Sequence, residues 1–329
     1  MRKFFYSLII LLASANTFAQ TFYSNPFAHT FSIVARDSVT GEMGAAVQSH
    51  WFSVGSIVTW GEAGVGVIAT QSFVNPAFGP KGLELLKQGK SPQEVVKILT
   101  DADSGRDVRQ LAVLDAKGRS AAWTGKNCIP EAGHITGKNF SVQANLMLNN
   151  TVWPEMAKAF KASKAPLAER LIAALEAGQQ AGGDIRGKQS ASILVVKAQN
   201  TGKVWEDRYI DLRVEDSADP IAELKRLLKI FRAYEHMNNG DLATEKGDMQ
   251  AAAKEYGEAE KMFPDNEEMK YWHAVTLVNN GKIDEALPLF KEAFRKNRNW
   301  VTLTQRLPKV GLLKADQAAL GKIYALMGE

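Results

Sequence analysis

The stretch Thr30-Phe31-Ser32-Ile33-Val34-Ala35-Arg36-Asp37 decides how the rest of this 329-residue chain is interpreted. Its β-branched and aromatic residues are typical of a strand. It opens with a threonine, about ten residues after a segment that has the pattern of a secretory signal. A hydroxyl side chain close to a mature N-terminus suggests one kind of chemistry, that of a hydrolase whose nucleophile is a terminal threonine.

Residues 1–19 have the pattern of a signal peptide. A basic start is followed by an apolar run over residues 4–15, too short to anchor the chain stably in a bilayer, and Ala19 precedes the expected cut. We expect an exported protein, periplasmic or secreted, with no membrane span after signal removal. The alternative is an uncleaved anchor.

Composition excludes several classes of protein. The net charge of +4 gives no reason to expect a nucleic-acid partner. The single cysteine, Cys128, excludes an intrachain disulfide. The five histidines show no paired metal-ligand spacing, and no phosphate-binding or dinucleotide fingerprint occurs, so we expect no metal and no cofactor.

The chain changes character near residues 216–220. Before this point lie glycine-rich turns and apolar runs of strand length, and after it lie helical patterns only. We therefore expect a first domain over residues 20–217 and a helical domain over residues 218–329. Several strands are apolar on both faces, which favours sheets covered on both sides.

The order of elements in the first domain predicts an α+β fold, a four-layer αββα sandwich of two antiparallel sheets between helices. We expect strands over residues 30–37, 43–49, 55–60, 65–70, 107–114, 119–124, 140–147, 190–197 and 204–212, and helices over about 80–88, from Ser91-Pro92 onward, and over 155–177 with a break near Pro166.

The helical domain contains a repeat with a period of 34 residues, which is that of tetratricopeptide repeats. Small residues let the two helices of a unit approach closely, and an aromatic fills the groove between units. We expect a helix over residues 221–233 before the repeats and a cap over 303–327. Four residues recur 34 positions later: Gly247, Ala252, Tyr256 and Ala259 as Gly281, Ala286, Phe290 and Ala293.

Thr30 carries its own base if it becomes the first residue. The α-amine, with an ordinary pKa of about 7.7–8.0, then lies beside the hydroxyl and accepts its proton during attack on a carbonyl. Backbone N–H groups must stabilise the developing oxyanion. The alternative interpretation is an ordinary β-branched residue at the start of a strand.

Four motifs occur in order: TFSIVARD from Thr30, GVGVIATQSFVNPAFGPKGLELL from Gly64, GRDVRQLAVLD from Gly105 and GGDIRGKQSASILVV from Gly182. Together they resemble a bacterial family catalogued as domain of unknown function 1028, over about residues 30–197. The fold of that family resembles the Ntn (N-terminal nucleophile) hydrolases. The resemblance implies hydrolysis of an amide bond, and it implies Thr30 as the nucleophile.

The resemblance also implies that backbone amides of Thr70, Gln71 and Ser72 form an oxyanion corner after a strand that ends at Ala69, with Asn75 shaping the same loop. Two features depart from the superfamily pattern. Proteasome-like members keep a lysine near the nucleophile, whereas this chain has none between Lys3 and Lys81. Arg36 and Arg109 are candidates to replace it, and the alternative for each is a solvated strand residue. In addition, residues 20–29 precede Thr30, so the His29–Thr30 bond must be cleaved.

Further candidates for substrate binding come from two stretches of the chain and from His50 at the end of a predicted strand. The glycine-rich run 182–190 brings polar side chains before a strand, and alternation along another strand puts two amides on one face. The alternatives are a solvated connector and a polar outward face. A Cys128–His134 nucleophile pair is a further alternative. The substrate-binding candidates are His50, Asn75, Arg109, Gln143, Asn145, Asp184, Arg186 and Gln189.

The leading hypothesis is therefore an exported hydrolase that cleaves a small amide or peptide-like bond with Thr30. The alternative is a silent, ligand-binding first domain, with helical repeats that bind a protein or peptide partner of the cell envelope. The repeats could instead serve dimerisation or pack on the first domain. The sequence fixes neither the substrate nor whether the chain forms a homo-oligomer.

Overall fold

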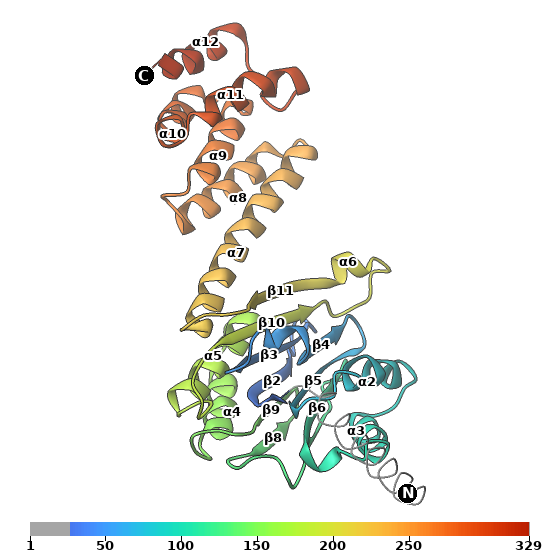
Figure 1. Ribbon diagram of the computed structural model, residues 1–329. Coiled ribbons are helices and arrows are strands. Elements are labelled where there is room, and N and C mark those ends of the chain that lie inside the picture. The colour runs from blue at the N-terminus through green and yellow to red at the C-terminus, as the bar shows by residue number, and fades with distance from the viewer. Residues whose placement is uncertain (1–26, 329) are drawn as a thin grey trace, which may run out of the picture. The chain divides into compact units, whose positions relative to one another are not determined.

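The structure is a computed structural model that describes residues 27–328 (Figure 1). The chain divides into two compact units, residues 1–226 and 227–329. The predicted signal peptide, residues 1–19, lies outside the described residues. Among the helices within residues 27–328, none is both long enough and apolar enough to cross a membrane.

The first unit is built on two antiparallel sheets. A five-stranded sheet has the order β1-β5-β6-β7, with β4 also paired to β5, and a six-stranded sheet has the order β11-β10-β3-β2-β9-β8. The strands are β1 (Phe27–Ala28), β2 (Thr30–Arg36), β3 (Met43–Ser49), β4 (Thr59–Glu62), β5 (Gly66–Phe73), β6 (Arg109–Asp115), β7 (Ser120–Thr124), β8 (Gly133–Gly137), β9 (Phe140–Ala144), β10 (Ser190–Val196) and β11 (Arg208–Val214).

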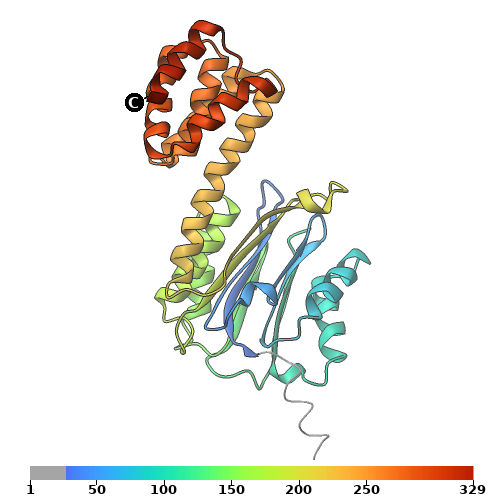
Figure 2. The ribbon, with the colours of Figure 1, turned by 45° about the horizontal axis from the view of Figure 1, so that its top comes forward.

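Two pairs of helices complete four layers, as Figure 2 shows. Helices α2 (Phe78–Lys87) and α3 (Pro92–Asp101) pack on the five-stranded sheet, and α4 (Val152–Ala162) and α5 (Leu167–Gln180) pack on the six-stranded one. The predicted αββα sandwich is confirmed. Alternate residues of β2 explain the layering: Val34 belongs to the core between the sheets, while Phe31 lies against the helix side, close to Gly178.

Local sequence signals determine the β2–β3 turn and the start of α3. The β2–β3 turn is held by Asp37, whose carboxylate accepts from the N–H groups of Val39 and Thr40, at 2.7 and 3.0 Å. This tight turn sets the register in which Thr30 pairs with Ser49. The predicted start of α3 is confirmed, with Ser91 in a capping box.

Some predicted elements differ from those observed. Residues 54–56 form a 3-10 turn (η1, Val54–Ser56) because the left-handed backbone of Ser53 turns the chain before β4. A short helix, α6 (Val204–Asp207), replaces the expected start of β11, since Asp207 folds back to accept from Thr201. Strands β1 and β8 were not predicted. A second 3-10 turn, η2 (Arg106–Val108), precedes β6.

The second unit is helical, and its predicted 34-residue repeat is confirmed. Ala252, Tyr256 and Ala259 are buried in α8, and the residues 34 positions later are buried in α10. Gly240 lies against the Tyr256 ring, which is the expected close approach of two helices. The elements are α7 (Pro220–Glu245), which also includes the last residues of the first unit, α8 (Met249–Met262), α9 (Glu267–Asn279), α10 (Ile283–Lys296), α11 (Asn299–Arg306), η3 (Leu307–Val310), α12 (Gln317–Ala325) and η4 (Leu326–Gly328).

Candidate functional site

Thr30 is the first residue of β2 and is fully buried. The residues before it form β1, which belongs to the other sheet: Phe27 pairs with Phe73 and Ala28 with Ser72 of β5. The chain therefore passes from one sheet to the other through His29. The Thr30 hydroxyl donates a hydrogen bond to the Ala28 carbonyl oxygen at 2.7 Å. Residues 27–29, which we call the leader, cover the nucleophile candidate.

The carbonyl oxygen of His29 belongs to the peptide bond that precedes Thr30, and two side chains donate to it. The Ser49 hydroxyl lies at 2.6 Å and Nη2 of Arg186 at 2.7 Å. Ser49 is in place because β3 pairs with β2 in the register that puts it opposite Thr30. Two donors on one carbonyl oxygen, one of them cationic, suit the stabilisation of negative charge at that atom.

Asp184 positions the Arg186 side chain. Its oxygens accept from Nε of Arg186 at 3.0 Å and from Nη2 at 2.7 Å, a bidentate pair. The Asp184 carboxylate is completely buried and also accepts from the N–H of His50 at 3.1 Å. A rigid loop thus aims the guanidinium at the His29 carbonyl.

The imidazole of His29 is itself buried between side chains of both sheets. Its Nδ1 lies 2.7 Å from Oδ1 of Asn145, and its ring meets the Phe73 ring edge-on at 5.4 Å. Burial lowers the pKa of His29; the Asn145 hydrogen bond and the Asp184 charge oppose this, and the Arg186 charge adds to it. The imidazole is therefore neutral near pH 7.

A network of buried amides underlies Thr30 between the sheets. Gln71 Nε2 and Asn145 Nδ2 both donate to the Thr30 carbonyl, at 3.1 and 3.4 Å, and both donate to Oε1 of Gln110, at 2.7 and 2.9 Å. Ser32 donates to Gln71 Oε1 and accepts from Gln143 Nε2, each at 2.5 Å. Because buried amides are held from several sides, the main chain at Thr30 has one fixed position.

The structure brings several predicted residues together around Thr30. Gln71, Asn145, Asp184 and Arg186 lie within one or two hydrogen bonds of its main chain, and Gln143 joins the network through Ser32. His50 takes part through its backbone N–H on Asp184.

The expected oxyanion corner is placed differently. Thr70, Gln71 and Ser72 do not follow a strand that ends at Ala69; they lie inside β5, which continues to Phe73. The Thr70 N–H donates to the Val58 carbonyl at 3.1 Å, so pairing within the sheet occupies it. The groups that donate to the His29 carbonyl are the side chains of Ser49 and Arg186 instead.

Three other candidates have side chains that bind away from Thr30, although the backbone N–H of Gln189 donates to the Ser49 carbonyl at 3.1 Å. Asn75 and Arg109 both bind Asp103, at 3.2 and 2.9 Å, and so fix the loop after β5. Arg109 also donates to the Phe73 carbonyl. Gln189 donates to Asp216 at 3.1 Å.

Neither arginine expected to replace the missing lysine does so. Arg36 lies at the opposite end of β2, about 20 Å along the strand, and Arg109 is engaged at the loop. The cation at the candidate site is Arg186.

The Cys128–His134 alternative finds no support in the side-chain arrangement. The Cys128 thiol donates to the Arg109 carbonyl at 3.4 Å, and burial raises its pKa. Nδ1 of His134 instead lies 2.8 Å from the Thr124 hydroxyl. A thiol with a raised pKa is a poor nucleophile because the thiolate is the reactive form.

Sequence reasoning missed Ser32, Ser49 and Gln110. Each carried a signal: Ser32 shares a strand face with Thr30, Ser49 ends the partner strand of the hairpin, and Gln110 stands opposite Gln71 in the register of β5 and β6. These signals become useful only once strand register is known.

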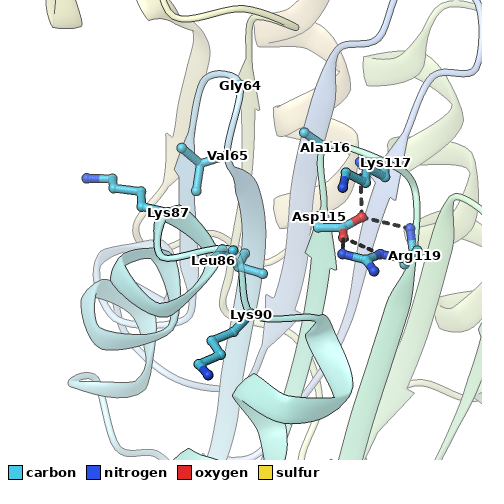
Figure 3. Close-up of a pocket in the computed structure, with 10 residues that line it drawn as sticks. Gly64, Val65, Leu86, Lys87, Lys90, Asp115, Ala116, Lys117 and Arg119 are labelled. Atoms are coloured by element: carbon cyan, nitrogen blue, oxygen red, sulfur yellow. Dashed lines mark hydrogen bonds and ion pairs between the residues drawn. The ribbon is translucent and has the colours of Figure 1, made fainter.

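A cavity of about 330 Å³ lies at the other end of β5 (Figure 3). Asp115, which lines it, pairs with Gly66 at the start of β5, whereas Gln71 lies near its end. The backbone N–H of Lys117 and the guanidinium of Arg119 donate to the Asp115 carboxylate. The amines of Lys87 and Lys90 point away from Asp115. The Asp115 carboxylate is already paired with Arg119 at 2.7 Å, and the cavity lies away from Thr30, so we do not assign it to the site. Within residues 27–328 no cluster of metal-binding side chains occurs.

Comparisons with known proteins agree with this architecture. A crystal structure of a protein from Silicibacter pomeroyi, assigned to DUF1028, is 34% identical and aligns with a TM-score of 0.56, over 61% of this chain and 85% of that one. No curated protein matches. A tetratricopeptide repeat is matched over residues 243–307. The family of unknown function DUF1028 is matched over residues 30–224, more than half of the chain, and the chain therefore belongs to this family.

Proposed function

We propose that this protein is an exported hydrolase of the Ntn type, which cleaves an amide or peptide-like bond with Thr30 after the His29–Thr30 bond has been cut. One observation carries the proposal: the carbonyl oxygen of the peptide bond that precedes Thr30 accepts hydrogen bonds from Ser49 and Arg186. This carbonyl is thereby polarised toward attack by its own neighbour.

The first step is self-cleavage. The Thr30 hydroxyl oxygen attacks the His29 carbonyl carbon, and Ser49 and Arg186 stabilise the oxyanion. The carbon–nitrogen bond then breaks, and the hydroxyl proton passes to the Thr30 nitrogen. Water hydrolyses the resulting ester, so that His29 leaves as a carboxylate and Thr30 keeps a hydroxyl and a free amine.

The second step repeats this chemistry on a substrate. The Thr30 amine takes the hydroxyl proton while the oxygen attacks the substrate carbonyl, and the proton then leaves with the substrate amine. Water hydrolyses the ester to release the acid. The Arg186 guanidinium, although paired with Asp184, is the cation we assign to the role that a lysine has in proteasome-like members, which is to disfavour a second positive charge on the amine.

The extent of the family match supports the proposal independently. The match to the family model begins at Thr30, the residue that the proposal makes the first of the mature chain.

Mass spectrometry of the intact purified protein tests the proposal. We expect a chain that begins at Thr30, and we expect Thr30→Ala to retain the leader while Thr30→Ser is still cut. Thr40→Ala, at the exposed β2–β3 turn, is the matched control and should be cut normally. A wild-type chain that begins at Gln20 and hydrolyses no member of an amide library would overturn the proposal.

The repeat unit supports a second, separate function, the binding of a peptide partner. A cavity of about 370 Å³ is lined by Tyr256, Trp272 and Asn279, together with the carboxylates of Asp241 and Glu245. Aromatic walls with two acidic groups suit a basic side chain. Quenching of Trp272 fluorescence by a lysine-rich peptide, but not by a glutamate-rich one, is expected in the full chain and should be lost in Glu245→Lys.

A further inference from the structure

The leader shows how an extended peptide binds beside Thr30. Strand β4 pairs with β5 only as far as Ala69, and β1 continues that edge at Ser72 and Phe73. Once the His29–Thr30 bond is cut and the leader departs, this part of β5 becomes an open strand edge. Such an edge offers backbone hydrogen bonds to another extended chain.

The side chain of His29, the residue before the cut bond, lies in a slot formed by Asn145 and Phe73. The Asn145 amide nitrogen donates to Gln110 and Thr30, so the Asn145 oxygen that faces the slot is an acceptor. The His29 ring must therefore donate from Nδ1, with the Phe73 ring against its other side. A buried acceptor that loses its donor disfavours a purely apolar occupant.

The charge of Arg186 further limits which side chains the slot can accept. Arg186 lies against the carbonyl of the same residue, and the leader presents a neutral ring there. A lysine or arginine side chain in the slot would bring a second cation close to this guanidinium, whose effect on the pKa of the residue in the slot is larger than the opposing effect of its partner Asp184. A neutral aromatic ring with an N–H group meets all three requirements. It donates to the Asn145 oxygen, packs against the Phe73 ring and adds no positive charge beside Arg186.

We propose that the substrate of the mature protein is an extended peptide that replaces the leader along β5 and carries histidine immediately before the cleaved bond. This inference rests on the proposed function and specifies its substrate class. Thr30 attacks the carbonyl carbon of that histidine, the bond to the following amine breaks, and water releases the peptide acid. The same Ser49 and Arg186 groups stabilise the oxyanion.

The test uses the full chain with Thr30 as its first residue and three coumarin amides: acetyl-Phe-Ala-His, acetyl-Phe-Ala-Leu and acetyl-Phe-Ala-Lys. We expect kcat/KM for the histidine peptide to exceed the others by about tenfold or more. Phe-Ala-His acid should also inhibit more strongly than Phe-Ala-Leu acid. Phe73→Leu should lower the histidine preference, and Phe52→Leu, an exposed control, should leave it unchanged.

The outcomes separate this inference from the proposed function. Hydrolysis of all three peptides at equal rates, or of small amides only, overturns the histidine-peptide substrate and leaves Thr30 as a nucleophile. A chain with a free Thr30 terminus that hydrolyses no amide at all overturns both.

Discussion

The hydroxyl of Ser49 lies 2.6 Å from the carbonyl oxygen of His29 and donates a hydrogen bond to the peptide bond that precedes Thr30. The two residues are 20 positions apart and meet because β2 and β3 pair with Thr30 opposite Ser49. The hairpin register therefore brings a hydrogen-bond donor to the bond whose cleavage we propose. The relationship predicts the consequence of removing that donor.

Ser49→Ala should slow the cleavage of the His29–Thr30 bond by about 100-fold or more, the usual effect of losing one oxyanion donor. The rate is measured as the conversion of newly translated chain to the shorter form over time. Ser56→Ala, which alters an exposed turn hydroxyl, is the control and should be processed at the wild-type rate. Normal processing of Ser49→Ala would remove Ser49 from the mechanism.

The leader should detach from β5 as the pH falls. Burial lowers the pKa of His29 in the folded chain, so the detached leader binds protons more readily than the docked one. Docking is therefore at full strength above the ordinary histidine pKa of about 6.5 and weakens below it. In the uncleaved Thr30→Ala chain, protease sensitivity of the leader should rise below about pH 6.5.

The control for this pH effect is the His29→Asn, Thr30→Ala chain, which carries no titrating ring in the slot. Its leader should show no change in sensitivity between pH 7.5 and 5.5. Parallel pH profiles for the two chains would show that other groups, rather than His29, release the leader.

The amide network should contribute strongly to stability. Gln110 accepts from Gln71 and Asn145 and donates to the Ala144 carbonyl at 2.8 Å. Gln110→Ala removes one hydrogen-bond partner from each of these buried groups and should lower the free energy of unfolding by about 3 kcal/mol, measured by urea denaturation. The exposed Gln93→Ala should change it by less than about 0.5 kcal/mol. Equal effects of the two substitutions would contradict a structural role for the network.

Much of the fold was predictable because its signals are local. The start of β3 is predicted at residue 43, after a short gap that follows the strand over 30–37, and the start of α3 is predicted from Ser91-Pro92; both are as expected. The 34-residue recurrence identified the helical repeat because buried small and aromatic residues return at a fixed spacing. Such elements are signalled by neighbouring residues or by a fixed spacing along the chain.

The candidate site was predictable in its residue types but not in its geometry. Arg186 was expected near the cleft, yet its position over the His29 carbonyl depends on the buried Asp184, whose N–H partner His50 is 134 residues away in sequence. Strand β1 escaped prediction because a two-residue strand carries no periodic pattern. Contacts between segments that are distant in sequence determine both the position of Arg186 and the pairing of β1, and no local sequence pattern encodes such contacts.

The helical repeat offers a matched pair of glycines for the last prediction. In α7, a Cβ at Gly240 would lie 2.8 Å from the Tyr256 ring, whereas in α8 a Cβ at Gly257 would meet only the end of the His273 side chain, at 4.0 Å. Alanine favours helix over glycine by about 1 kcal/mol. Gly257→Ala should therefore stabilise the repeat unit by about 0.5–1 kcal/mol.

Gly240→Ala should instead destabilise the unit by about 1–2 kcal/mol, because overpacking against the buried Tyr256 outweighs the gain in helix propensity. Thermal unfolding followed by circular dichroism measures both changes in the full chain. Residue 274, which is 34 positions after Gly240, is a buried alanine, so the second repeat accommodates a Cβ at this position beside Phe290. The double variant Gly240→Ala, Tyr256→Phe keeps the ring in place and should remain destabilised. If Gly240→Ala proves as stabilising as Gly257→Ala, the close approach of α7 to Tyr256 does not constrain the repeat.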